Sequence, residues 1–572
     1  MKSLKVPAAL VRGATLSLAL CVASCSSTPP PPHENYTHAA GERGILASCL
    51  PRVVAAREAA ILGAARPQQQ LQLEIQLPLR NQAELTRLLR DLYDPKSPNF
   101  HKYLSASAFT ERFGPAAADY RKVVAWAKSK GFNVTGTTPN RRLVAVAASV
   151  DTVNRAFSVS VNNYRHPTEG RTFYSPDREP TAVGLAVPIL QVTGLNNYSL
   201  PHPMLKRGVP AFAAGSGPSG EYLPSDMRAA YYGKGPLTGA GQTIGILSFD
   251  GYLASDVQLY YSQTGMSSNV PIKNVLVAGF NGACTAAGST TSSTCDDGEQ
   301  VLDIVNSIGM APGIQQILFY EGSSDTQILN QMATDNVAKV LSSSWGWNPA
   351  DAASDDPIFQ EFAAQGQTFV TASGDDGAYN SSTYAFPGVD PYVTEVGGTD
   401  LTTTGPGGAW SAETAWSQSG GGNVSGTAIP SWQQLVGVIN STNLGSTTLR
   451  NSPDVAAEAN FDNPTVINGS LVTGYGGTSF ATPRWAGFLA LVNQQSVANG
   501  HGTVGFVNPA LYNLGTSSSY PSAFHDIASG SNPPTSGTGS GFNAVPGYDL
   551  VTGWGSPAGA SLINLLAGSN AK

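Results

Sequence analysis

After Glu221 the chain alternates apolar, strand-like runs with segments of helical period, and this alternation restricts the fold more than any other feature. The strand-like runs are "GQTIGILSF", "QILFYEG", "AKVLSSSWGW" and "QTFVTASGDDG", and the helical segments are "GEQVLDIVNSIGMAP", "ILNQMATDN" and "ATPRWAGFLALVNQQSV". Alternating strands and helices predict a mostly parallel α/β sheet. The functional site of such a sheet lies at the carboxyl ends of its strands.

Residues from about 70 to 198 predict a separate α+β domain. "LQLEIQLPL" and "RLVAVAAS" are strand-like, whereas "AAADYRKVVAWAKSKGF" and "VDTVNRAFSV" are helical. A further helix, "NQAELTRLLRDLYD", places four leucines at helical spacing, namely Leu85, Leu88, Leu89 and Leu92. The stretch "PHPMLKRGVPAFAAGSGPSG" then indicates a linker. Its basic pair Lys206–Arg207 would be an accessible place for proteolytic nicking, although a plain interdomain hinge has the same composition.

The charge is divided unevenly along the 572 residues. Residues 1–214 hold 25 Lys+Arg and 13 Asp+Glu (+12), and residues 215–572 hold 7 and 26 (−19), which together give the net charge of −7. The two parts attract each other, and protonating carboxylates weakens that attraction, so acid could loosen the contact. Two unrelated domains of different isoelectric point would give the same division. The basic residues are spread along the chain, so nothing favours nucleic-acid binding.

The N-terminus is typical of an export signal. Lys2, Lys5 and Arg12 precede the apolar run "GATLSLALCVASC", which is too short to span a bilayer. "VASC" resembles a bacterial lipobox that would make Cys25 a lipid anchor, and the proline-rich "SSTPPPPH" follows it as a tether. The alternative is an ordinary cleaved signal peptide.

Two cysteines of the acidic part, Cys284 and Cys295, flank the loop "TAAGSTTSST". In an exported protein this spacing predicts a local disulfide. Two free thiols are the alternative.

The stretch "GGTSFATP" offers a candidate nucleophile, Ser479, in a tight turn that opens a helix. Such a turn lets backbone approach a substrate, although most serines in this position only cap helices. A serine nucleophile needs a base. After residue 215 the histidines are His501 and His525, and both follow Ser479, so a subtilisin-type order of Asp, His and Ser is impossible in this part of the chain.

Carboxylates can take the place of the histidine. Glu299 and Asp303 are four residues apart in a helical segment and therefore share a face, where one proton can be shared between them. Glu299 could accept the proton of Ser479 while Asp303 orients it. In "TASGDDG", a protonated Asp375 could donate a hydrogen bond to the oxyanion, with Asp376 as the adjacent alternative. The non-catalytic alternatives are an exposed acidic helix face for Glu299 and Asp303 and an ordinary turn aspartate for Asp375.

These motifs together resemble the sedolisins, or serine-carboxyl peptidases, and in particular kumamolisin-type proenzymes. The shared stretches include "GGTSFATP", the E-x-x-x-D pair of "GEQVLDI", "SSSWGW", "ASGDDG", "FPGVDPYVTEVGGT" and "PGYDLVTGWG", in the order of the family. The turn reads "GGTS" where "SGTS" is usual. "SPNFHKYLSASAFTERFGP" is similar to the inhibitory activation domain of these proenzymes.

The resemblance implies a subtilisin-like α/β catalytic domain preceded by a ferredoxin-like α+β prodomain. It implies Ser479 as nucleophile, Glu299 as general base, Asp303 as its support and Asp375 as oxyanion stabiliser. Aspartates in glycine-rich turns suit a hard cation, and the resemblance implies one Ca²⁺ held by the side chains of Asp526 and Asp549 and by three backbone carbonyls, those of Ile527, Val545 and Gly547. Val545 stands where glycine is frequent.

We therefore expect a signal peptide at 1–25, a tether and poorly defined segment at 26–65, an inhibitory prodomain at 66–200, a processing linker at 201–220 and a peptidase domain at 221–572. The expected activity is hydrolysis of proteins or peptides in acid, where a carboxylate base and a protonated Asp375 can coexist. A catalytically silent binding protein and an exopeptidase of the same fold are the alternatives. A metallohydrolase is disfavoured because the chain lacks H-E-x-x-H.

Overall fold

The computed structural model describes residues 50–211, 214–284, 295–347, 352–380, 386–536 and 539–568. All of them fall within one compact unit, Ala40–Lys572. The predicted signal peptide with Cys25, and the tether up to residue 49, lie outside the described residues. Within the described part, none of the helices has both the length and the apolar composition needed to cross a bilayer.

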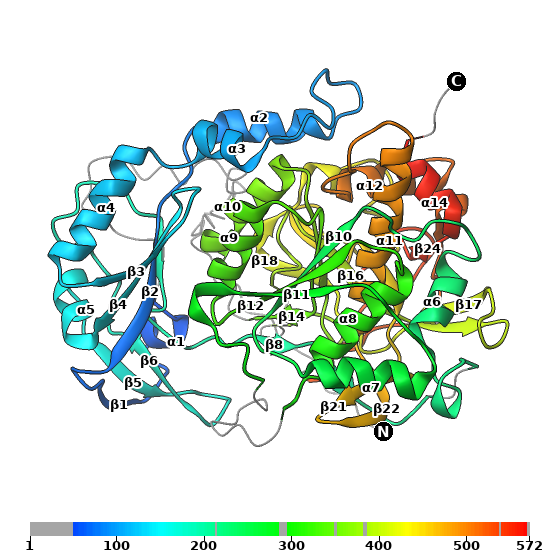
Figure 1. Cartoon of the computed structure of the whole chain (residues 1–572), viewed down its shortest axis with the longest axis horizontal. Helices are drawn as coiled ribbons and strands as arrows, with labels where there is room; N and C mark the ends of the chain where they lie inside the picture. The colour runs from blue at the N-terminus through cyan, green and yellow to red at the C-terminus, as the bar shows by residue number, and fades with distance from the viewer. Residues whose placement is uncertain are drawn as a thin grey trace, which may run out of the picture. The chain divides into compact units, whose positions relative to one another are not determined.

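The N-terminal domain is built on a four-stranded antiparallel sheet with the order β3-β4-β2-β7. The bounds are β2 Gln70–Gln76, β3 Asn133–Thr137, β4 Leu143–Ser149 and β7 Gln191–Thr193, with helices α4 Ala117–Ser129 and α5 Val150–Phe157. Helices follow the first and third of these strands, which is the βαββαβ arrangement of ferredoxin-like domains. The predicted α+β prodomain fold is therefore confirmed. Figure 1 shows α4 and α5 on one face of this sheet, where Trp126 and Phe157 are buried in its core.

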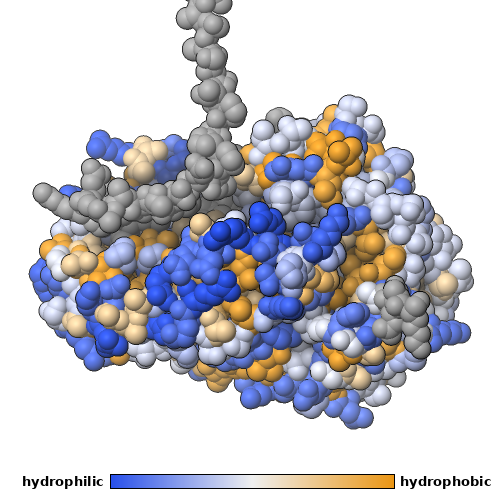
Figure 2. All heavy atoms as spheres, turned by 90° about the horizontal axis from the view of Figure 1, so that it is seen from above, coloured by the Kyte–Doolittle hydropathy of each residue, from blue (hydrophilic) through white to orange (hydrophobic). Residues whose placement is uncertain are grey.

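Two further helices, α2 Gln82–Leu92 and α3 Ala106–Phe113, lie outside that core. The four leucines predicted from helical spacing are all buried in α2, but they join the core of the C-terminal domain. Seen from the side of α2 and α3, the surface over these helices is largely hydrophilic (Figure 2). The helices are thus amphipathic elements whose apolar faces bind the second domain.

The segment 50–65 is more ordered than the sequence predicted. It holds helix α1 Arg52–Ala55 and strand β1 Ile61–Ala64, and β1 extends a small sheet with β5 Val161–Arg165 and β6 Thr172–Pro176. Buried Val53 and Val54 pack with Tyr164 and Phe173 in a small core. This burial gives the segment a fixed conformation that its composition alone did not indicate.

The C-terminal domain contains an eight-stranded sheet with the order β11-β12-β10-β13-β15-β16-β17, and β20 pairs with β16 off this path. The bounds are β10 Thr243–Ser248, β11 Ile272–Leu276, β12 Gln316–Glu321, β13 Val340–Ser343, β15 Thr368–Ala372, β16 Thr394–Thr403, β17 Trp410–Ala415 and β20 Val455–Glu458. All pairs are parallel except β16 with β17. The predicted mostly parallel sheet is confirmed.

Helices cover both faces of this sheet (Figure 1). The helices of this domain are α6 Pro224–Tyr231, α7 Ala254–Thr264, α8 Gly298–Met310, α9 Asp325–Asp335, α10 Ala352–Ala364, α11 Thr478–Ala498, α12 Asn508–Gly515, α13 Tyr520–Ala523 and α14 Gly559–Leu566. Ile244 and Ile246 of β10 join the core that contains α8 and α11, whereas Leu247 joins the core that contains α9 and α10. Strands buried on both faces explain the nearly continuous apolar runs in the sequence.

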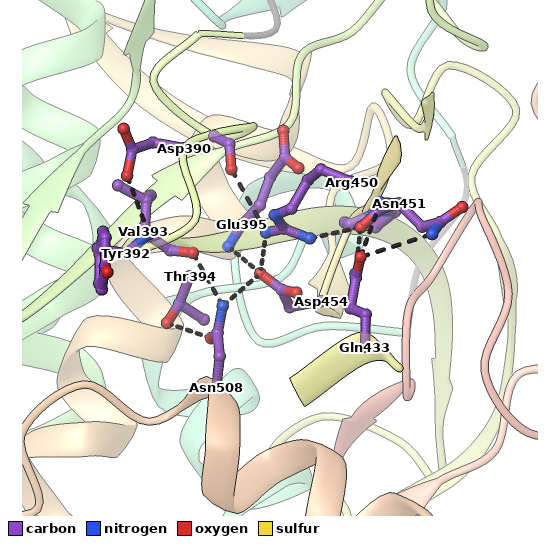
Figure 3. Close-up of polar contacts among 12 residues, drawn as sticks. Asp390, Tyr392, Val393, Thr394, Glu395, Gln433, Arg450, Asn451, Asp454 and Asn508 are labelled. Carbon is purple, nitrogen blue, oxygen red and sulfur yellow. Dashed lines mark hydrogen bonds and ion pairs between the residues drawn. The ribbon is translucent and has the colours of Figure 1, made fainter. Parts of the chain in front are cut away.

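A buried polar network holds strands and a helix of the C-terminal domain together (Figure 3). Arg450, in β19 Leu449–Ser452, donates a 2.7 Å hydrogen bond to Asp454, and neither side chain is exposed. Asp454 also accepts hydrogen bonds from the backbone N–H of Glu395, Nδ2 of Asn508 and the hydroxyl of Tyr512. One paired carboxylate therefore joins β16, β19 and α12.

The remaining strands form short pairs outside the two main sheets. They are β8 His202–Pro203, β9 Lys206–Arg207, β14 Trp345–Gly346, β18 Gly422–Ala428, β21 Asn463–Ile467, β22 Ser470–Gly476, β23 Phe524–His525 and β24 Ser556–Pro557. The start of the linker is not the accessible hinge that its composition indicated, because β8 pairs with β14 and β9 pairs with β22. Cys284 and Cys295 form a disulfide, as predicted.

The two domains meet through α9 and α10. Nε2 of Gln76 donates to Oγ of Ser354 at 3.0 Å, and the hydroxyl of Tyr93 donates to the carbonyl of Ala363 at 2.6 Å. Arg142 is buried against three carboxylates of the C-terminal domain, those of Asp355, Asp356 and Glu361. The interface is therefore both apolar and charged.

Candidate active site

Helix α8 presents the two predicted carboxylates in its first turns. Glu299 and Asp303 are four residues apart on one face, and both side chains are buried. Burial raises the pKa of Glu299 well above its ordinary value, and the charge of Asp303 raises it further. Burial also raises the pKa of Asp303. Since two adjacent buried carboxylates cannot both ionise easily, the pair can hold one shared proton.

The nucleophile candidate is the second residue of α11. Ser479 follows Gly477, whose φ of +141° favours glycine, and a Cβ at residue 477 would lie 2.7 Å from Oδ2 of Asp375 and against the carbonyl oxygen of Met204. The hydroxyl of Ser479 donates to that Met204 carbonyl, and the N–H of Ser479 lies 3.4 Å from the same oxygen. A peptide carbonyl thus sits directly on the candidate nucleophile.

Glu299 lies close enough to Ser479 for the hydroxyl to lower its pKa, although burial dominates. Among the described residues, neither carboxylate oxygen of Glu299 has a hydrogen-bond partner with regular geometry. The carboxylate is therefore free to accept a proton when the serine turns away from Met204.

Asp375 follows the carboxyl end of β15. Its Oδ1 accepts the N–H of Thr478 at 2.8 Å and the hydroxyl of Thr478 at 2.9 Å. Its buried Oδ2 has no partner within the described part of the chain. Burial raises the pKa of Asp375 to about 7. In acid a protonated Oδ2 can donate a hydrogen bond toward an oxyanion.

Two contributing residues were not predicted from the sequence. Oγ of Ser344 donates to Oδ1 of Asp303 at 2.6 Å, and the Ser344 carbonyl accepts the N–H of Met204 at 2.9 Å. Thr478 holds Asp375 through two donors. The available signals were the end of the β13 strand in "SSSWGW" and the position next to Ser479.

The linker occupies the site. Nζ of Lys206 lies 2.5 Å from the carbonyl of Asp375 and 2.5 Å from Oδ1 of Asp376. The predicted alternative, Asp376, therefore contacts the linker side chain rather than Thr478. The two histidines of the C-terminal domain lie elsewhere: His525 stacks on Trp410 with ring centroids 4.0 Å apart, and His501 lies beside Gly568.

The predicted calcium ligands gather around one loop. The N–H of Val545 donates to Oδ2 of Asp549 and the N–H of Gly547 donates to Oδ1 of Asp526, each at 3.1 Å. Ile527 directly follows Asp526 and its side chain is buried. These two contacts bring Asp526 and Asp549 to the backbone of the same loop, and carboxylate and carbonyl oxygens are the ligands that Ca²⁺ prefers.

Comparisons with known proteins cover both domains. Residues 58–198 match the model "Pro-kumamolisin, activation domain", and residues 272–504 match "Subtilase family". The second match agrees with the predicted subtilisin-like fold.

Relatives align along most of the chain. The chain is 32% identical to Sedolisin of Pseudomonas sp. (strain 101), over 96% of this chain and 95% of that protein. It is 29% identical to Kumamolisin of Bacillus sp. (strain MN-32), over 82% of this chain and 87% of that protein. A solved structure of Pseudomonas sedolisin, a serine-carboxyl proteinase complexed with pseudo-iodotyrostatin, aligns with 33% identity and a TM-score of 0.50, covering 62% of this chain and 98% of that one.

Proposed function

The chain belongs to the sedolisin family of serine-carboxyl peptidases, and on this premise we propose that it is an exported, acid-active endopeptidase made as a self-processing proenzyme. One observation carries the proposal: the hydroxyl of Ser479 lies on the peptide carbonyl of Met204, with Glu299 beside that hydroxyl and Oδ2 of Asp375 close to Gly477, next to the same carbonyl. The buried carboxylates supply the base and the acid that a histidine would otherwise supply.

In the proposed reaction, Glu299 takes the proton of Ser479 as the serine oxygen attacks the carbonyl carbon of the substrate. In its active form the pair carries one proton that Glu299 and Asp303 share, so an oxygen of Glu299 can still accept the serine proton. A protonated Asp375 donates from Oδ2 to the developing oxyanion. The N–H of Ser479 is a second donor to this position. The N-terminal domain acts as an inhibitor because its linker fills the cleft.

Endopeptidase action is supported by the contacts on both sides of the carbonyl. Strand β8 precedes Met204 and pairs with β14, and strand β9 follows it and pairs with β22. The site therefore accommodates substrate residues on both sides of the nucleophile. An exopeptidase needs the site closed on one side so that it recognises a chain end.

We also propose that the side chains of Asp526 and Asp549 and the carbonyls of Ile527, Val545 and Gly547 hold one Ca²⁺. When bound, the cation would neutralise the two carboxylates and stabilise the loop. Export is supported by the basic and apolar N-terminal pattern, and lipidation of Cys25 by the lipobox-like "VASC".

The test is incubation of the full-length chain at pH 4 and pH 8, with and without a denatured protein substrate. Wild type should process itself and digest the substrate in acid, and Ser479→Ala should do neither while staying folded. Digestion that survives Ser479→Ala would refute the proposal, and so would a folded wild-type chain that stays inactive at pH 4.

A further inference from the structure

We propose, resting on the function proposed above, that the chain cuts itself between Met204 and Leu205, and that the contacts around this bond define its preferred substrates. In the preferred peptides, the residue before the cut bond has an apolar side chain without a β-branch. The second residue after the cut bond is lysine. The linker is thus bound in the active site as the enzyme's own substrate.

The backbone register selects this bond. The Met204 N–H donates to the Ser344 carbonyl at 2.9 Å, and the Met204 carbonyl oxygen accepts from both Oγ and N–H of Ser479. The strand pairs on either side fix the register, with Pro203 opposite Trp345 and Lys206 opposite Gly476. A shift of one residue would break both pairs, so the carbonyl on Ser479 is specified.

Water is the only co-reactant that cleavage of this bond needs. Ser479 Oγ bonds to the Met204 carbonyl carbon as its proton passes to Glu299. The C–N bond to Leu205 then breaks, and the Leu205 nitrogen takes that proton. Water hydrolyses the ester, which leaves a Met204 carboxylate, a new Leu205 amine and regenerated Ser479.

The pocket around Met204 favours an apolar side chain without a β-branch. Met204 lines a cavity with Ser373, Gly374, Tyr379 and Gly420. A Cβ at Gly374 would lie 3.9 Å from the Met204 sulfur, and a Cβ at Gly420 would clash with the Ser373 carbonyl. The glycines thus leave a narrow slot between backbone segments, which a linear thioether chain can follow.

The preference for lysine comes from Asp376. Its Oδ1 lies 2.5 Å from Nζ of Lys206 and accepts a 3.1 Å hydrogen bond from Oγ1 of Thr535, which orients it. The pair is partly exposed, with side-chain exposures of 34% for Lys206 and 43% for Asp376. A pair this exposed should change kcat/KM by roughly two- to fivefold.

The alternative cut, after the basic pair, is disfavoured by the same contacts. Lys206 is held by Asp375 and Asp376, and both residues of the pair lie in β9. Another protease would have to pull this strand off β22 to reach the bond after Arg207.

The first test is to identify the earliest product when full-length wild type is acidified, by mass spectrometry and N-terminal sequencing. Leu205 as the new N-terminus, formed at a rate independent of protein concentration, supports the proposal. Met204→Leu should cut at the same bond within about fivefold of the wild-type rate. Met204→Asp should slow that cut by about 100-fold or more, because a charge would enter the slot. A Ser479-dependent first cut elsewhere would overturn this inference but leave the proposed function intact.

The second test does not depend on folding of linker variants. Processed wild type and Asp376→Asn are given Ac-His-Pro-Met-Leu-Lys-Arg-NH2 and its Lys-to-Ala analogue. Wild type should cut both between Met and Leu and favour the lysine peptide by roughly two- to fivefold. Asp376→Asn should lose the preference and cut the lysine and alanine peptides at equal rates. Equal preference in both enzymes, or cleavage at another bond, would overturn the proposal.

Discussion

The hydroxyl of Ser344 lies 2.6 Å from the carboxylate of Asp303, and both side chains are buried. This hydrogen bond lowers the pKa of Asp303 against the dominant effect of burial. Ser344 therefore controls how the proton of the Glu299–Asp303 pair is distributed, without touching the reacting atoms itself.

We expect Ser344→Ala to reduce kcat by roughly tenfold or more, since hydrogen bonds to charged groups contribute about 1.5–3 kcal/mol. The midpoint of the acid limb of the pH profile should move to higher pH, because the ionised form of the pair loses a donor. Ser342→Ala is the control, since the buried Ser342 hydroxyl has no partner among the described residues. An unchanged acid limb in Ser344→Ala would show that the contact is only structural.

The loss of activity on the alkaline side of the pH profile should follow the deprotonation of Asp375. Burial raises its pKa to about 7, so the protonated donor form is present below pH 7 and is lost as the pH rises through it. Self-processing should fall off above about pH 7. Asp375→Asn should lower the rate but flatten this limb, because an amide donates at every pH. A limb that persists unchanged in Asp375→Asn would assign it to another group.

Acid should strengthen the docking of the prodomain on the peptidase domain, whereas the loss of charge attraction alone would weaken it. Nδ2 of Asn140 donates to Glu361 at 3.2 Å, and burial raises the pKa of Glu361 to about 7 despite Arg142. A raised pKa means that docking is favoured below the ordinary pKa of glutamate and weakened as pH rises through 7. This opposes the sequence-based hypothesis that acid loosens the contact.

The measurement is hydrogen exchange of the Leu104 amide, which bonds the Ala364 carbonyl across the interface at 2.9 Å, in the full-length Ser479→Ala chain. After correction for intrinsic rates, protection should increase from pH 8 to pH 5, and Glu361→Gln should remove most of this dependence. Protection that is lost on acidification would favour charge release instead.

Calcium removal should destabilise the chain. With EDTA at pH 6.5 we expect the unfolding temperature to fall by roughly 5 °C or more, as for loss of a saturating ligand. Asp549→Asn should be insensitive to EDTA, whereas Asp119→Asn, an exposed prodomain control, should respond like wild type. No effect of EDTA on wild type would rule out the site.

Much of this arrangement could be predicted from the sequence because local patterns encode it. The buried strands and helices followed from periodicity, and the four-residue spacing placed Glu299 and Asp303 on one face. Contacts between distant segments could not be predicted in this way. Met204 reaches Ser479 across 275 residues, and the linker, rich in proline and glycine, forms short strands only because the cleft supplies β14 and β22. Ser344 was missed because its role depends on Asp303 from another element.

The central claim is that a carboxylate, not an imidazole, takes the serine proton. The most direct measurement compares kcat/KM for the peptide Ac-His-Pro-Met-Leu-Lys-Arg-NH2 at pH 4 among wild type, Glu299→Gln and the double variant His501→Gln/His525→Gln, each brought to the same processed form with added wild-type enzyme that is then removed. Glu299→Gln should lose about 100- to 10,000-fold, the usual contribution of a general base, and the double histidine variant should match wild type. Wild-type activity in folded Glu299→Gln, or its loss in the histidine variant, would contradict the account.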